Sequence, residues 1–167
     1  MTPAELLSHS FDRILESALA AVDGLDEEAL AARPAPHANP IGWLVWHLAR
    51  VQDDHIAGIS GLDQVWTSQG YAARFGLPIP TSDIGYGQTS EQVAAVRVGA
   101  EPLTEYLRAV HAQTAGYVAG LSEADLDEVV DERWYPPVTR GVRLLSVVGD
   151  DLQHAGQAAY VRGLLGR

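Results

Sequence analysis

Four long segments of this sequence repeat their apolar residues every three and four positions, and this pattern constrains the fold more than any other feature. Such spacing places apolar side chains along one face of an α-helix. Amphipathic helices without a series of strand-like segments bury their apolar faces against one another. We therefore predict an all-α four-helix bundle, formed by a single domain over residues 1–167. The helices are predicted over residues 3–22, 40–61, 90–120 and 142–165.

Local signals mark the helix ends and the connections between helices. Thr2-Pro3-Ala4-Glu5 and Thr89-Ser90-Glu91-Gln92 have the pattern of a capping box, and Asn39-Pro40 reads as a helix cap followed by proline. Residues 61–88 are rich in Gly, Pro and Ser, which predicts a long connection with a short helix near 71–75. A short hairpin is expected within residues 131–141.

Composition excludes several classes of function. The chain has no cysteine, which excludes disulfides, a thiolate nucleophile and cysteine-type zinc sites. A net charge of −11 argues against nucleic acid or an anionic membrane as partner, because both bind basic surfaces. No apolar run reaches membrane-spanning length, and the acidic N-terminal segment lacks the basic region of a signal peptide. The expected compartment is the cytoplasm.

Two helices each direct ionisable groups toward the predicted interior. His154 lies seven residues from both Val147 and Val161 in an apolar stripe, and Asp150 lies one turn before it. His47 occupies an apolar stripe of the second helix. Two imidazoles and a carboxylate on facing helices are a metal-ligand set for zinc, nickel or iron(II) that leaves positions open for water or substrate.

Several neighbours are candidates for supporting roles. Asp54, seven residues after His47, and Asp151, rotated by about 100° from Asp150, are expected at the rim or as groups that orient an imidazole. His111 shares a stripe with other apolar residues of the third helix, so core packing is favoured over a place in the same cavity. The tryptophans are expected to form core or cavity wall: Trp43, Trp46 and Trp66.

A simpler interpretation exists for each group taken alone. A single histidine in an apolar stripe is more often a hydrogen-bonded core residue than a ligand. An aspartate and a histidine four residues apart on a helix also form ordinary ion pairs. The joint placement of His47, Asp150 and His154 favours a metal site over both interpretations.

The segments "PIGWLVWHLARVQDD" and "DDLQHAGQAAYVRGLL" resemble the DinB-like (YfiT-like) metalloenzyme superfamily over nearly the whole chain. The actinobacterial branch and the N-terminal domain of mycothiol-dependent maleylpyruvate isomerase are the most similar. The resemblance implies an up-down-down-up bundle with a divalent metal, zinc or nickel or else iron, held by His47, Asp150 and His154. Relatives carry His or Glu where this chain has Asp150, and many carry Arg and His where it has Gln153 and Gln157.

The resemblance also implies a function. Members of the family join a low-molecular-weight thiol, such as mycothiol or bacillithiol, to a small electrophile, and homodimers are expected. A metal-dependent thiol transferase is therefore the main hypothesis, with Arg74 in the 61–88 connection binding a carboxylate of the thiol. Maleylpyruvate isomerase has a further C-terminal domain, so the same isomerisation is not expected. The alternatives are a non-enzymatic, stress-related or ligand-binding bundle with a vestigial metal site, and a metal-dependent hydrolase.

Overall fold

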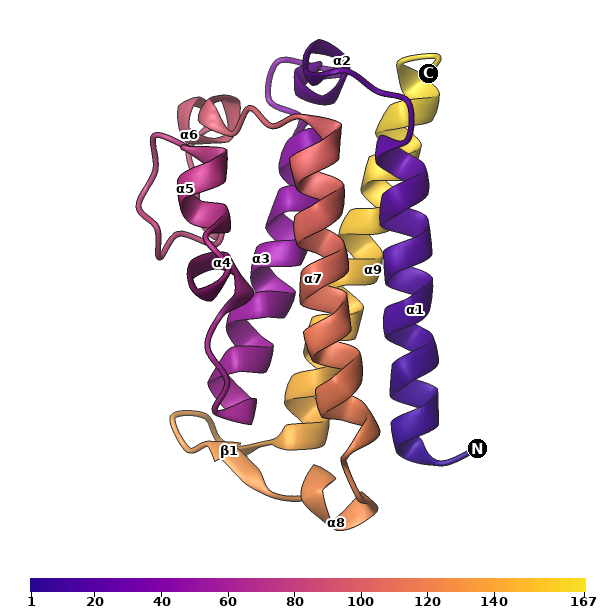
Figure 1. Cartoon of the computed structure of the whole chain (residues 1–167), viewed down its shortest axis with the longest axis vertical. Helices are drawn as coiled ribbons and strands as arrows, with labels where there is room; N and C mark the ends of the chain where they lie inside the picture. Colours follow the sequence, from indigo (N-terminus) through magenta and orange to yellow (C-terminus); the bar gives the residue numbers. More distant parts are fainter.

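The computed structural model describes residues 1–167 and contains nine helices and one two-stranded sheet (Figure 1). Four long helices form the bundle: α1 (Pro3–Val22), α3 (Ile41–Ser60), α7 (Ala100–Ala119) and α9 (Arg140–Leu164). Helix α9 packs against α1 and α3, and α7 packs against the same two helices. In Figure 1, α1 and α9 run upward while α3 and α7 run downward. The predicted all-α fold is confirmed, and no helix combines the length and apolarity needed to span a membrane.

Short elements fill the connections between the long helices. The capping boxes predicted at Thr2 and Thr89 are both formed. The helix predicted near residues 71–75 is present, and the predicted hairpin pairs Val129 with Thr139 and Asp131 with Val138. These elements are α2 (Glu27–Ala31), α4 (Val65–Ser68), α5 (Tyr71–Phe75), α6 (Ser90–Ala95), α8 (Glu123–Leu126), β1 (Val129–Asp131) and β2 (Val138–Thr139).

The prediction of one continuous helix over residues 90–120 is wrong. The chain forms α6, leaves the helical conformation at Val96, and begins α7 after Gly99. Pro102, the third residue of α7, explains the break, because proline has no N–H and its ring clashes with the preceding turn. Proline is therefore tolerated only within the first turn. The N-cap of α3 also differs from expectation, since it is Pro40 and not Asn39.

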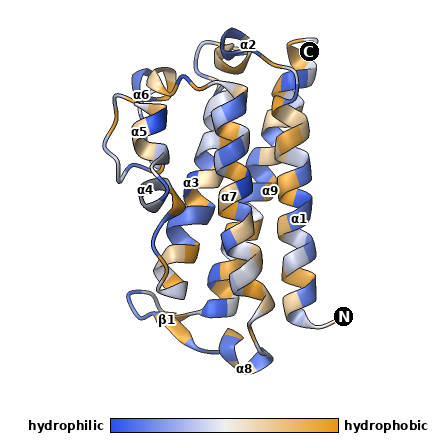
Figure 2. Cartoon of the chain, in the orientation of Figure 1, coloured by the Kyte–Doolittle hydropathy of each residue, from blue (hydrophilic) through white to orange (hydrophobic).

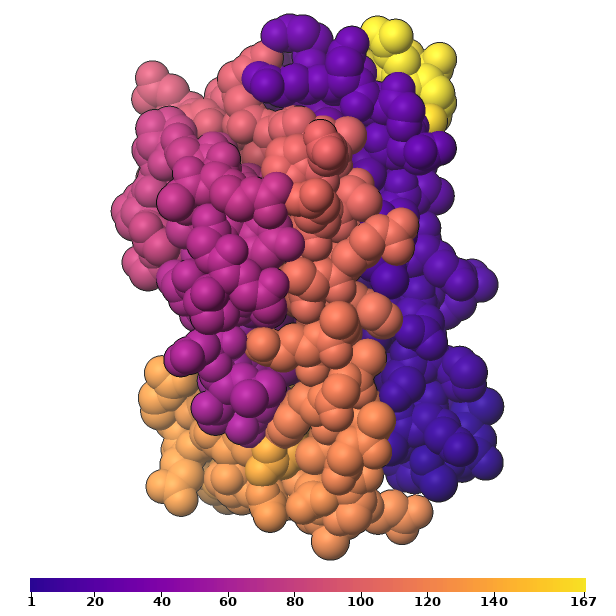
Figure 3. All heavy atoms as spheres, in the orientation of Figure 1, coloured from indigo at the N-terminus to yellow at the C-terminus, as the bar shows by residue number.

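The core lies along the bundle axis, and polar residues alternate with apolar ones around each long helix (Figure 2). All four long helices contribute side chains with no more than 2% exposure. The connection between α3 and α7 packs against both helices through α4, and Figure 3 shows its atoms in magenta beside those of α7. The largest core side chains include Phe11, Ile14, Leu44, Trp46, Leu48, Leu103, Leu107 and Tyr106.

A buried polar cluster fastens this connection to α3. The carboxylate of Asp53 accepts hydrogen bonds of 2.8 Å from the backbone N–H groups of Val65 and Trp66 and from the Tyr106 hydroxyl. Arg50, which is fully buried, lies 3.5 Å from Asp53 and donates to the Tyr106 oxygen at 3.3 Å. A buried charge requires such partners. The cluster therefore determines the direction in which the connection leaves α3.

Candidate metal centre

Three side chains converge between α3 and α9. His47 comes from α3, Asp150 and His154 come from adjacent turns of α9, and one potential ligand atom of each lies within 4.8 Å of the other two. The centroids of the two imidazole rings are 4.7 Å apart. Metal–ligand bonds of about 2.0–2.2 Å place donor atoms at most about 4.4 Å apart. A small rotation of the side chains is thus sufficient to close this cluster on an ion.

His47 is oriented by a backbone carbonyl. Its Nδ1 lies 2.5 Å from the oxygen of Ile84, and since a carbonyl only accepts, Nδ1 carries the hydrogen and Nε2 carries the lone pair. The ring stacks on Trp43 with centroids 4.7 Å apart. Burial lowers the pKa of His47, which outweighs the opposing effect of the Ile84 hydrogen bond. A neutral imidazole with a free Nε2 is the form that binds a metal.

His154 is presented in the same way from the other helix. Its Nδ1 lies 2.9 Å from Oε1 of Gln157, so an N–H at Nδ1 donates to this oxygen and leaves Nε2 as the free nitrogen. Nε2 lies 3.7 Å from Oδ2 of Asp150. That oxygen is buried and has no hydrogen-bond partner. An unpartnered buried carboxylate oxygen is costly, and a divalent cation would satisfy it, so the donor set fits a metal ion.

The centre opens toward solvent on the α9 side. The side chains of Asp150 and His154 remain 26% and 17% exposed, whereas His47 is buried. Tyr86, from the connection, stands edge-on to the His47 ring at 5.2 Å and is largely exposed. Burial, together with the negative charge of Asp150, raises the pKa of Tyr86. Its phenol therefore stays protonated at neutral pH and is able to donate a hydrogen bond at the opening.

The loop that carries Ile84 fits closely against the centre. Gly85 has φ +101°, and a Cβ there would overlap Nδ1 of His47 and lie 3.2 Å from the Trp43 ring. Asp83 accepts from the Gly85 N–H at 2.7 Å, and Gln88 accepts from the Trp43 indole N–H at 2.7 Å. Sequence reasoning missed Ile84, Gly85 and Gln88, and the only signal was the pair of glycines around Tyr86.

Asp54 does not orient His47. It accepts from Gln64 Nε2 at 2.8 Å and lies 3.3 Å from Nδ1 of His55. Seven residues of α-helix separate Asp54 from His47 by about 10 Å along the axis, so the two share a face but are two turns apart. The group that orients the His47 ring is the backbone carbonyl of Ile84, whereas a carboxylate was predicted for this role.

Asp151 is not at the rim, as predicted, but in the core. It is 0% exposed, and neither carboxylate oxygen has a hydrogen-bond partner. The rotation from Asp150 turns Asp151 toward the bundle axis, on the face that holds Val147 and Ala158. Burial, with a smaller contribution from Asp150, raises the pKa of Asp151 well above the ordinary value and so favours its neutral form.

Two other predicted pocket residues serve the packing of the bundle. Arg74 forms an ion pair with Glu105 of α7, and its guanidinium lies 5.0 Å from the centre of the Tyr71 ring. His111 lies 3.2 Å from Asp12 of α1, which joins α7 to α1. Of the predicted pocket residues, Trp43 contacts the centre directly, since its ring stacks on His47 and meets His154 edge-on at 6.3 Å.

Comparison with known proteins agrees with this fold. A conserved protein of Enterococcus faecalis, known from a crystal structure, is 35% identical to this chain, with a TM-score of 0.93 over 100% of this chain and 99% of that one. A DinB-like protein from Bacillus cereus has the same fold at 16% identity, with a TM-score of 0.65 over 97% and 92% of the two chains. No curated protein matches the sequence, and the likeness to maleylpyruvate isomerase stays a prediction.

The sequence model of the DinB superfamily matches residues 10–158, which run from α1 into α9 and include all three residues of the candidate centre. The match covers most of the chain, and the chain therefore belongs to the DinB superfamily.

Proposed function

We propose that this protein is a divalent-metal-dependent enzyme that joins a low-molecular-weight thiol of the mycothiol kind to a small electrophile. The proposed metal ligands are His47, Asp150 and His154. The observation that carries the proposal is that both histidines have Nδ1 hydrogen-bonded to an acceptor, while one potential ligand atom from each of the three residues lies within 4.8 Å of the other two. Metal-ligating histidines are typically oriented by such hydrogen bonds.

Two imidazoles and one carboxylate leave coordination positions open. A divalent ion held by them would lower the pKa of a thiol or water bound at an open position. Around that position, Trp43 fixes the His47 ring and the Tyr86 phenol donates a hydrogen bond to the incoming molecule. The chain has no cysteine, so no thiol of its own competes for the ion. Nitrogen and oxygen donors suit zinc or nickel.

The ligand set is tested by metal binding. Zinc and nickel are titrated into metal-free protein by calorimetry, and we expect one ion per chain. The variant His154→Ala is expected to lose stoichiometric binding because one imidazole is removed. The matched control is His111→Ala, which removes a histidine paired with Asp12 away from the centre and is expected to bind metal normally. Stoichiometric metal in His154→Ala would show that the ligand set is wrong.

The reaction is tested with zinc-loaded protein, mycothiol and monochlorobimane, and the conjugate is detected by mass spectrometry. Conjugation that requires both the metal and His154 supports the transferase. Hydrolysis of p-nitrophenyl acetate without thiol, with no conjugate formed, would instead identify a metal-dependent hydrolase. Failure of the wild-type protein to bind zinc or nickel would favour the non-enzymatic bundle.

A further inference from the structure

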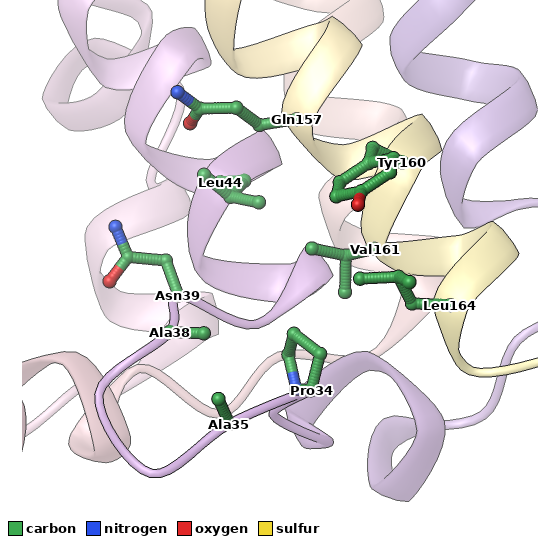
Figure 4. A pocket seen from close by; sticks show the side chains of 9 residues that line it. All are labelled: Pro34, Ala35, Ala38, Asn39, Leu44, Gln157, Tyr160, Val161 and Leu164. Atoms are coloured by element: carbon green, nitrogen blue, oxygen red, sulfur yellow. The ribbon is translucent and has the colours of Figure 1, made fainter.

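A second feature of the α3–α9 interface adjoins the candidate centre. A pocket of about 370 Å³ lies between these helices and the segment that precedes α3 (Figure 4). Leu44 lines it one turn before His47, and Gln157 lines it one turn after His154. Gln157 also accepts the hydrogen bond from His154. The pocket and the centre therefore share a wall.

The chemistry of the pocket differs from that of the surface around it. None of its nine lining residues is charged, and six are hydrophobic, although the chain carries a net charge of −11. Gln157 occupies the end nearer to the centre, while Pro34, Ala35 and Leu164 lie at the other end in Figure 4. Gln157 is thus the polar lining residue nearest to the centre, and the hydrophobic residues form most of the remaining wall, which also includes Asn39.

We infer that this pocket holds the apolar body of the molecule that reacts at the metal centre. The substrate is then a small amphiphile with a polar, metal-binding head and an uncharged alkyl or aryl group. This inference rests on the proposed function. A charged group in the pocket would lose its hydration without gaining a partner, whereas each buried methylene is favourable. The volume lies within the range of small-molecule sites, about 300–1,000 Å³.

The occupancy of the pocket is tested first without metal. The uncharged fluorescent probe N-phenyl-1-naphthylamine is titrated into metal-free protein, and we expect saturable binding. Ala38→Trp fills the pocket from the segment before α3, and Leu164→Asp places a charge at its exposed edge. Each is expected to weaken probe binding at least tenfold. The control is Ala159→Trp, on an exposed part of α9 that does not line the pocket, and it is expected to bind the probe normally.

The link to the centre is tested with straight-chain hydroxamic acids, from acetohydroxamic to octanohydroxamic acid, and zinc-loaded protein. We expect the dissociation constant to fall about fourfold for each added methylene until the pocket is filled. In Ala38→Trp and Leu164→Asp this gain disappears, while acetohydroxamic acid binds as in the wild type. Calorimetry measures the dissociation constants of acetohydroxamic acid and of the longer acids in each variant.

The possible failures are distinguishable. If acetohydroxamic acid binds but affinity is independent of chain length, the inference is overturned and the metal centre stands. If acetohydroxamic acid does not bind zinc-loaded protein at all, the proposed function fails, whatever the fluorescent probe does. If the protein dimerises and the dimer excludes the probe, a second copy of the chain covers the pocket, and the inference is again overturned.

Discussion

His47 is held by residues that lie nearly forty positions further along the chain. Ile84 accepts the hydrogen bond from its Nδ1, and Gly85 leaves the space that the ring needs. Helical phase alone predicted that His47, Asp150 and His154 share the interior, and the structure brings them together. Helical phase did not predict the contacts of Ile84 and Gly85 with His47. The path of an irregular loop depends on contacts such as that of Asp83 with the Gly85 N–H.

Gly85→Ala tests this close fit. The new Cβ would displace the His47 ring, and we expect zinc affinity to fall by about 10–100-fold, as for loss of a group that orients a ligand. Gly87→Ala is the matched control, since Gly87 also has positive φ, at +70°, but has no atom near its Cβ position. Because φ is positive at both positions, each variant also introduces backbone strain, on the order of 1–3 kcal/mol. Equal zinc affinities in the two variants would contradict the prediction.

The acidic residues of α9 show a limit of prediction from helical phase. Adjacent helical positions differ by about 100°, which separates Asp150 from Asp151 but does not by itself decide which way each one turns. The direction depends on where α1, α3 and α7 pack around α9, which is a tertiary property. Asp151 therefore lies in the core, although a charged side chain was expected at the rim.

At the scale of elements, periodicity predicted the long helices well and their connections poorly. Helices α1 and α3 were predicted within two residues of their observed ends, whereas the break between α6 and α7 was missed. Val96 and Val98 are buried and continue the apolar pattern across the break, so the pattern alone did not reveal it. Pro102 was the local signal that marks the start of α7.

The connection between α3 and α7 depends on one carboxylate. Asp53→Ala leaves Arg50 without its buried partner and the N–H groups of Val65 and Trp66 without an acceptor. We expect the free energy of unfolding to fall by about 3–5 kcal/mol, measured by urea denaturation. Tyr106→Phe, which removes one hydroxyl and keeps Asp53, is expected to cost about 1 kcal/mol. A small, equal effect of both would show that the cluster does not anchor the connection.

The hairpin is attached to α9 through Asp131, which accepts from Arg133 at 2.8 Å and from Arg143 at 3.0 Å. Its hydrogen bonds with Arg133, and the charges of both arginines, lower the pKa of Asp131. A lowered pKa in the folded state stabilises the protein above the ordinary aspartate pKa, and this stabilisation is lost as the pH falls below it.

Asp131→Asn is therefore expected to lower the thermal midpoint at pH 7 by a few degrees. The difference from the wild type should shrink as the pH falls below the ordinary aspartate pKa, because Asp131 then binds a proton in the unfolded chain while the folded chain still holds it as a carboxylate. Thermal unfolding followed by circular dichroism between pH 7 and pH 2 measures this. Glu132→Gln, at an exposed neighbouring position without an ion pair, is the control. A difference that is constant with pH would contradict the explanation.

At the scale of the whole molecule, the candidate centre joins α3 to α9, so a bound ion stabilises the bundle itself. A ligand that binds only the folded state at 100 times its dissociation constant adds about 2.7 kcal/mol. For a domain of this size that corresponds to a rise of about 5–10 °C in the thermal midpoint. We expect this rise when zinc is added to the wild type and none in His154→Ala. A similar rise in both would indicate binding elsewhere.

The order of the elements along the chain has a consequence for biosynthesis. His47 lies on the second long helix, whereas Asp150 and His154 lie on the last. A nascent chain that has emerged from the ribosome as far as α7 offers one imidazole of this set and holds an ion weakly. An ion bound by the proposed centre would therefore be taken up late, after α9 has been synthesised and has docked against α3.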